Sequence, residues 1–170
     1  DIPAEGRDFS FSDQAFWVDR WQEFRLPYSV QSPEAPLIAE LFLMPQRAEG
    51  DDASDITGLL IRGRLTGTVV VPCDRCAEEA VVELNHTMDE FEALPEADAS
   101  QDAPASSQAS SQTSPDEDAW NDGFLQERPQ GLAFDVQGFL WEQFQLAMPV
   151  KPLCSEGCEG LCPQCGKRLG

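Results

Sequence analysis

Apolar and polar positions alternate from Leu59 to Val71, the clearest regular pattern in the chain. One alternate set is apolar or glycine: Ile61, Gly63, Leu65, Gly67, Val69 and Val71. The other set is largely polar: Leu60, Arg62, Arg64, Thr66, Thr68 and Val70. Period-two alternation rich in β-branched residues predicts a strand with one buried face.

A second alternating stretch runs from Ala80 to Phe91. Its apolar side holds Ala80, Val82, Leu84, His86 and Met88. The segment between the two stretches, residues 72–79, is short enough to be the turn of a hairpin. We therefore expect Cys73 and Cys76 at the tip of a β-hairpin, and we expect His86 to be a packed or edge residue rather than a catalytic base.

Two apolar runs precede this hairpin. The first alternates only partly and holds Phe9, Phe11, Phe16, Trp17, Trp21, Phe24 and Leu26. The second runs from Leu37 to Met44 and is bounded by prolines. Both runs are predicted to be strands.

Helical periodicity appears only near the C-terminal end, over residues 135–147. Val136, Phe139, Leu140 and Phe144 fall on one face of a helix, Asp135 can cap its first turn, and Pro149 ends it. This aromatic stripe is expected to pack in the core. The predicted fold class is α+β: a mainly antiparallel β-sheet with a C-terminal helix.

Residues 93–122 are rich in Ser, Ala, Gln, Pro and acidic side chains. Such a composition buries too little apolar surface to offset the entropy lost on ordering. We therefore expect a single domain over residues 1–170 that carries a disordered acidic insertion at about 95–120.

The charge is strongly acidic, with 31 Asp and Glu against 11 Lys and Arg, a net charge of −20. This disfavours direct binding to nucleic acid or to an anionic membrane. Acidity keeps a protein soluble and monomeric, and it also suits a basic partner. Arg62, Arg64 and Arg75 could form a small basic patch, but we expect them to pair with nearby carboxylates. No run of about 18 apolar residues occurs, so no membrane span is predicted.

Six cysteines occur as close pairs: Cys73, Cys76, Cys154, Cys158, Cys162 and Cys165. Close pairs are typical of metal sites, and no signal peptide is visible, so we expect a reducing, cytoplasmic location. Zn²⁺ takes four ligands tetrahedrally, so four of the six cysteines are predicted to hold one structural ion in a zinc-ribbon-like knob. The remaining cysteine pair could belong to a second metal site. Spacing alone favours Cys162 and Cys165 as partners of Cys73 and Cys76, because Pro163 and Gly166 suit a tight turn.

The cysteines also allow a thiol redox or sensor protein. A redox Cys-x-x-Cys normally lies at a helix N-terminus, where the dipole lowers a thiol pKa, whereas Cys73 lies between two strands. No Gly-rich phosphate loop or Ser-His-Asp set can be assembled, so we do not expect an enzyme.

Several motifs together resemble the YceD family of large ribosomal RNA subunit accumulation proteins. They are Val71–Cys76 followed by a strand, then an acidic stretch, Leu146–Cys154 and Cys158–Gly166. The resemblance covers roughly Ile56 to the end, and the insertion departs from it. Some members lack the last cysteine pair but keep Cys or His near 154 and 158. The resemblance thus implies Cys73, Cys76, Cys154 and Cys158 as ligands, against the spacing preference.

The resemblance implies a role in the synthesis, processing or stability of large-subunit ribosomal RNA, in the bacterial cytoplasm or in plastids. Because of the net charge of −20, we expect a basic ribosomal protein or assembly factor to mediate this role rather than direct RNA contact. The function predicted from the sequence is therefore a non-catalytic zinc-binding accessory protein.

Replacing residues 97–117 with a short Gly/Ser linker should leave the melting temperature nearly unchanged, because loop-closure entropy changes slowly with length. Thermal unfolding followed by circular dichroism measures this. A large loss of stability would show that the segment packs against the domain.

Overall fold

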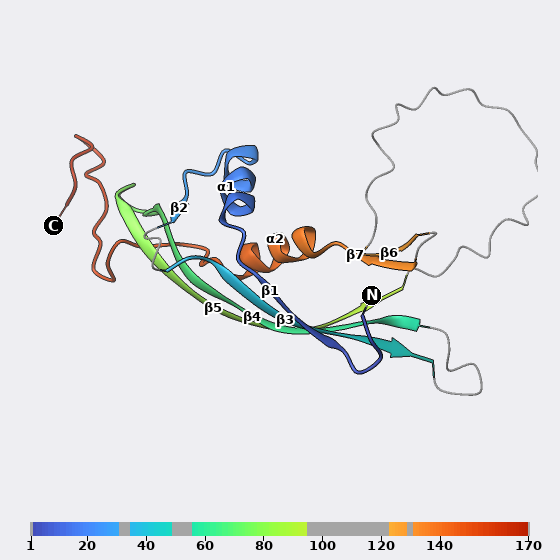
Figure 1. Ribbon diagram of the computed structural model, residues 1–170. Helices are drawn as coiled ribbons and strands as arrows, with labels where there is room; N and C mark the ends of the chain where they lie inside the picture. Colours follow the sequence, from blue (N-terminus) through green and yellow to red (C-terminus); the bar gives the residue numbers. More distant parts are fainter. Residues whose placement is uncertain (1, 31–34, 49–55, 95–122, 129–130, 170) are drawn as a thin grey trace, which may run out of the picture.

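A long β-hairpin forms the centre of the computed structural model, which describes residues 2–30, 35–48, 56–94, 123–128 and 131–169 (Figure 1). Strand β4 (Ile56–Pro72) pairs antiparallel with β5 (Glu79–Ala93), from Pro72↔Glu79 at the tip to Gly58↔Ala93. Burial alternates along both strands as their sequences predict, with Ile61, Leu65, Ala80 and Leu84 in the core. The predicted hairpin is confirmed. The expected insertion at 95–120 lies outside the described residues.

The other edge of β4 carries the rest of the sheet. Strand β3 (Ile38–Arg47) pairs antiparallel with β4, and β1 (Arg7–Phe11) pairs antiparallel with β3. The two-residue strand β2 (Ser29–Val30) continues along β4 at Val69 and Val70, beyond the end of β3. The expected strand at 37–44 is confirmed, and the described sheet is antiparallel throughout.

The first apolar run is only partly a strand, so the prediction for it was wrong after residue 11. Residues Gln14–Glu23 form helix α1, whose N-cap Asp13 accepts a hydrogen bond from the backbone N–H of Ala15 at 3.0 Å. The bulky side chains Phe16, Trp17 and Trp21 all lie on its buried face. A helix brings these three positions together, whereas a strand would place Phe16 and Trp17 on opposite faces.

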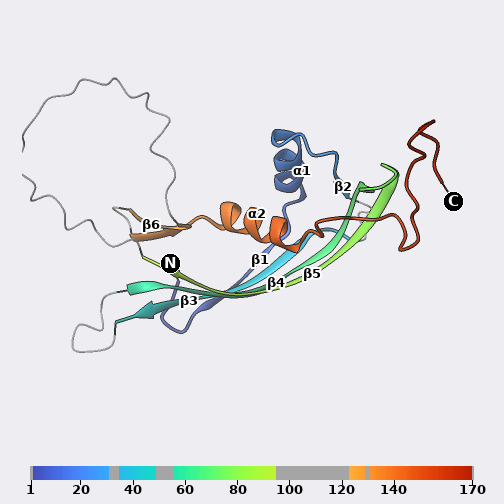
Figure 2. The same cartoon turned by 180° about the vertical axis from the view of Figure 1, so that it is seen from behind.

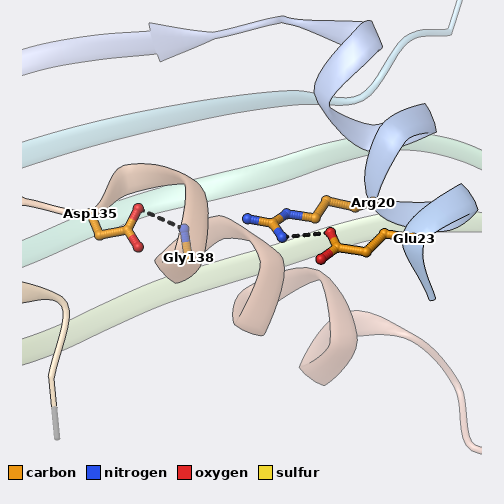
Figure 3. Close-up of polar contacts among 4 residues, drawn as sticks. All are labelled: Arg20, Glu23, Asp135 and Gly138. Atoms are coloured by element: carbon orange, nitrogen blue, oxygen red, sulfur yellow. Dashed lines mark hydrogen bonds and ion pairs between the residues drawn. The ribbon is translucent and has the colours of Figure 1, made fainter. Parts of the chain in front are cut away.

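Helix α2 (Val136–Ala147) is confirmed with its predicted cap. The Asp135 carboxylate accepts a hydrogen bond from the Gly138 N–H at 3.0 Å (Figure 3). The same view shows the ion pair of Arg20 with Glu23 on α1, at 2.7 Å. Before α2, the chain forms a short hairpin of β6 (Leu125–Arg128) and β7 (Gly131–Phe134), which the sequence pattern did not indicate.

Both helices lie on the inner side of the curved sheet (Figures 1 and 2). Trp17 and Trp21 of α1 pack against Phe144 of α2, with ring centroids 5.4 and 6.1 Å apart. The buried Gln143 side chain of α2 hydrogen-bonds His86 of β5 at 2.9 Å, which fixes α2 over the hairpin. In the part of the chain that the structure describes, neither helix has the length and apolar character needed to cross a membrane.

Gly67 occupies a crowded point of β4 with a φ of +142°. A Cβ there would lie 2.5 Å from the carbonyl oxygen of Pro36 and 2.9 Å from the Cα of Leu37. Both atoms belong to backbone that leads into β3, so they cannot move aside as a side chain can.

Gly67→Ala should therefore lower the free energy of unfolding by about 1–3 kcal/mol, through backbone strain and this close contact. Gly157→Ala is the control, because a Cβ at Gly157 meets no atom within 4 Å. Urea unfolding compares the two variants. Equal stability of the two variants would contradict the close contact between β4 at Gly67 and the backbone that precedes β3.

Candidate metal centre

Four thiols from two distant segments meet at the hairpin tip. Cys73 and Cys76 come from the turn between β4 and β5, and Cys154 and Cys158 come from the segment after α2. Their four Sγ atoms lie within 4.8 Å of one another. The Sγ atoms of Cys73 and Cys158 are 3.7 Å apart, those of Cys76 and Cys154 are 3.6 Å apart, and none forms a disulfide.

These distances fit a tetrahedral zinc ion. With Zn–S bonds of about 2.3 Å, the sulfurs of a regular tetrahedron lie about 3.8 Å apart. Four thiolates are also a donor set that soft or borderline metal ions prefer. The cluster can therefore hold one metal ion, and its donor set and spacing are consistent with zinc.

The hairpin turn directs its two sulfurs to the same side. The Ala77 N–H donates to the Cys73 carbonyl at 2.9 Å, and the Cys73 N–H donates to the Glu78 carbonyl at 2.7 Å. Ala77 has a φ of +60°, a conformation that costs a non-glycine residue about 1–2 kcal/mol. The tight turn thus presents both thiols to one ion.

Backbone contacts dock the C-terminal segment on this turn. The Asp74 N–H donates to the Pro152 carbonyl at 2.8 Å, and Arg75 Nη1 donates to the Cys158 carbonyl at 2.6 Å. Gly160, with a φ of +85°, lies against the backbone of Arg75. Arg75 therefore positions the segment that carries Cys158, a role that the sequence did not indicate.

The electrostatics of the cluster favour one thiolate and oppose further ones. Burial opposes ionisation of Cys73, but backbone N–H groups facing its sulfur lower its pKa to about 6. These groups belong to Cys154, Arg75 and Cys76. At Cys76 the Glu78 N–H lowers the pKa, but burial and the three neighbouring thiols outweigh it and raise the pKa to about 12. Burial likewise raises the pKa of Cys158. A divalent cation held by these four residues would supply the charge that lets all four thiols ionise.

The third cysteine pair lies apart. Cys162 is half-buried and Cys165 is exposed, and neither belongs to the group of four. The spacing preference, which paired them with Cys73 and Cys76, is not the arrangement in the structure. Instead, the structure brings together the four cysteines that the family resemblance implied. Arg168, close after this pair, donates through Nη2 to Cys154 Sγ at 3.9 Å.

The arginines of the hairpin are largely engaged. Arg62 pairs with Asp89 across β4 and β5 at 3.1 Å, and Arg75 binds the Cys158 carbonyl. The expected pairing with a carboxylate is observed for Arg62. Arg75 bonds a backbone carbonyl instead, and among the described residues Arg64 has no carboxylate partner.

A family model described as large ribosomal RNA subunit accumulation protein YceD matches residues 61–170, roughly two thirds of the chain. The chain belongs to the YceD family. The part that matches YceD begins within β4 and includes the hairpin tip, α2 and all six cysteines. Neither the curated proteins nor the solved structures gave a match.

Cys73→Ser and Cys158→Ser, one variant from each segment, should both lose tightly bound zinc and lower the melting temperature by about 10 °C, because metal binding is coupled to folding of the site. Cys165→Ser is the matched control and should keep the tight ion and the melting temperature. Elemental analysis and thermal unfolding measure both quantities. An unchanged zinc content and melting temperature in the first two variants would show that Cys73 and Cys158 do not bind the ion.

Proposed function

We propose that this protein is a non-catalytic zinc-binding accessory protein that supports the synthesis, processing or stability of large-subunit ribosomal RNA in the cytoplasm. The observation that carries the proposal is the YceD match, which spans the residues that build the four-cysteine cluster. The role comes from the family, and a metal ion held by the cluster would fix the shape of the hairpin tip.

A structural zinc ion accounts for the four thiols better than redox chemistry does. All four sulfurs surround one point, and three of the four cysteines are buried. Thiols that exchange disulfides with other molecules need access to solvent. Here the bound ion would fasten the segment after α2 to the hairpin, while Arg75 and the Asp74 N–H hold its backbone.

The surface near this site favours a basic protein partner, a ribosomal protein or an assembly factor. Exposed carboxylates occur at the hairpin tip and on the adjoining part of β5: Asp74, Glu78, Glu79 and Glu83. Arg62 and Arg75 are occupied by protein contacts, and the whole chain carries a net charge of −20. An RNA backbone would be repelled by this surface, whereas a basic protein would be attracted to it.

In binding assays with purified large-subunit ribosomal proteins, affinity should fall with rising salt, because the attraction is between exposed charges. The double variant E79Q/E83Q should bind its partner roughly 2- to 30-fold more weakly, at about 0.2–1 kcal/mol for each of the two lost pairs. The control E5Q/E142Q removes the same charge from two exposed sites outside β4 and β5, one near the N-terminus and one on α2, and should bind like the wild type.

In cells depleted of the protein, the ratio of large- to small-subunit ribosomal RNA should fall and should recover with the wild type but not with Cys73→Ser. Tight binding of the purified protein to large-subunit RNA at physiological salt, without any protein partner, would contradict the proposal that a basic protein links it to the RNA. Full recovery of the ribosomal RNA ratio with Cys73→Ser would contradict the proposal that the metal site is needed for this role.

A further inference from the structure

The border of the sheet along β5 carries no further strand. In the part of the chain that the structure describes, β5 pairs only with β4, and no backbone hydrogen bond joins its other side to another segment. Its 15 residues make this edge longer than that of β1, the five-residue strand at the opposite border. Figures 1 and 2 show both helices on the inner side of the sheet, where they leave this border open.

The hydrogen-bond register shows which backbone groups of β5 face the open border. Bonded pairs alternate along an antiparallel ladder. The Cys73 N–H donates to the Glu78 carbonyl, the Leu94 N–H donates to the Thr57 carbonyl, and the register between these two pairs is unbroken. The even-numbered residues of β5 therefore bond to β4. The N–H and C=O groups of its odd-numbered residues point away from β4, and between the ends of the strand these residues are Val81, Glu83, Asn85, Thr87, Asp89 and Phe91.

The side chains of these six residues are exposed on the outer face of the sheet. Val81 and Phe91 are large apolar side chains that are 47% and 53% exposed, whereas Ala80, Leu84 and Met88 of the alternate set are buried. Both the backbone groups and the outer side chains of this edge are thus available to another strand.

The charge of β5 selects the kind of strand that fits. The strand holds five carboxylates and neither lysine nor arginine, and its imidazole, His86, is bonded to Gln143. Charged side chains protect an open edge against pairing with its own copies, because like charges would then lie side by side. Lysine or arginine at alternate positions of a partner strand would instead lie opposite Glu83 and Asp89.

The inner side of the same border offers apolar surface. Val82 and His86 of β5 are half-buried under α2. Gln143 of α2 bonds His86, and Leu146, three residues later on the same side of the helix, has 63% of its surface exposed. An added strand with apolar side chains toward α2 and basic side chains on the outer face would match both sides of the border.

We propose that the open edge of β5, from Val81 to Phe91, binds a basic extended segment of a protein partner as an added antiparallel strand. Main-chain hydrogen bonds give such a complex its affinity, and the alternating side chains give it specificity. The inference rests on the proposed function for the basic character of the partner, and it adds where and how that partner binds.

A short peptide that alternates lysine with valine, acetylated and amidated, is the probe. In an antiparallel pair, residues bonded to each other have their side chains on the same face, so the lysine N–H groups would face β5 and the valine N–H groups would face solvent. N-methylation of the lysine backbone nitrogens should weaken binding roughly tenfold or more, and N-methylation of the valine nitrogens should change it by less than about twofold. Both modified peptides keep the charge of the parent peptide. Isothermal titration calorimetry measures the three affinities.

Thr87→Pro tests the edge from the side of the protein. It changes no charge and removes an N–H that points away from β4, so the bonds between β4 and β5 remain. It should weaken binding of the parent peptide roughly tenfold. The control Thr87→Ala keeps the N–H and should bind like the wild type, and thermal unfolding shows that both variants are folded.

Amide hydrogen exchange followed by NMR locates the contact. In the free wild type, the amides of Leu84 and His86 should exchange slowly and those of Asn85 and Thr87 quickly, because only the first two bond to β4. The parent peptide should slow the exchange of Asn85 and Thr87. Slow exchange of these two amides in the free protein would show that the chain itself occupies the edge, which would overturn the proposal.

Three further outcomes would also overturn the added strand. Equal binding of the lysine-methylated and parent peptides would show attraction by charge alone, which leaves the basic partner of the proposed function standing. Absence of binding by the parent peptide would remove the edge site, while the assays with ribosomal proteins test the partner itself. A dimer of the free protein in sedimentation that Thr87→Pro abolishes would show that a second copy takes the edge.

Discussion

One cluster of four thiols joins parts of the chain that are 78 and 85 residues apart in sequence. The segment after α2 depends on it, because that segment has almost no core of its own. Between Pro149 and Leu169 only Cys158 and Gly160 are buried. Without an ion, the tail would be held by a few hydrogen bonds to Asp74 and Arg75, each worth about 1 kcal/mol. The body of the domain is stabilised differently, by Trp17, Trp21 and Phe144 packed between the helices and the sheet.

Local patterns in the sequence were enough to predict the elements that depend on local physics. The β4–β5 hairpin follows from period-two alternation, and α2 follows from its apolar stripe and its cap at Asp135. Helix α1 was missed because its aromatic residues were interpreted as continuing the alternation of β1. Asp13, an N-cap residue placed just before Phe16 and Trp17, was the signal that could have found it.

The choice among cysteine pairs could not be made from spacing. Cys73–Cys76 and Cys162–Cys165 form nearly identical turns, so local geometry favours both equally. The path of the chain after α2 decides the matter: the Pro152 carbonyl meets the Asp74 N–H, which places Cys154 and Cys158 beside the hairpin tip and Cys162 beyond it. Such a path depends on tertiary contacts that no window of sequence contains. The family resemblance indicated the same four residues because it carries information from related chains.

The central claim, that one zinc ion is held by four thiolates at the hairpin tip, is tested most directly by zinc X-ray absorption spectroscopy on protein loaded with a single equivalent. The account predicts a shell of four sulfur atoms at about 2.3 Å and no nitrogen or oxygen ligand. A shell with fewer sulfurs completed by nitrogen or oxygen would contradict it, as would protein that retains no zinc.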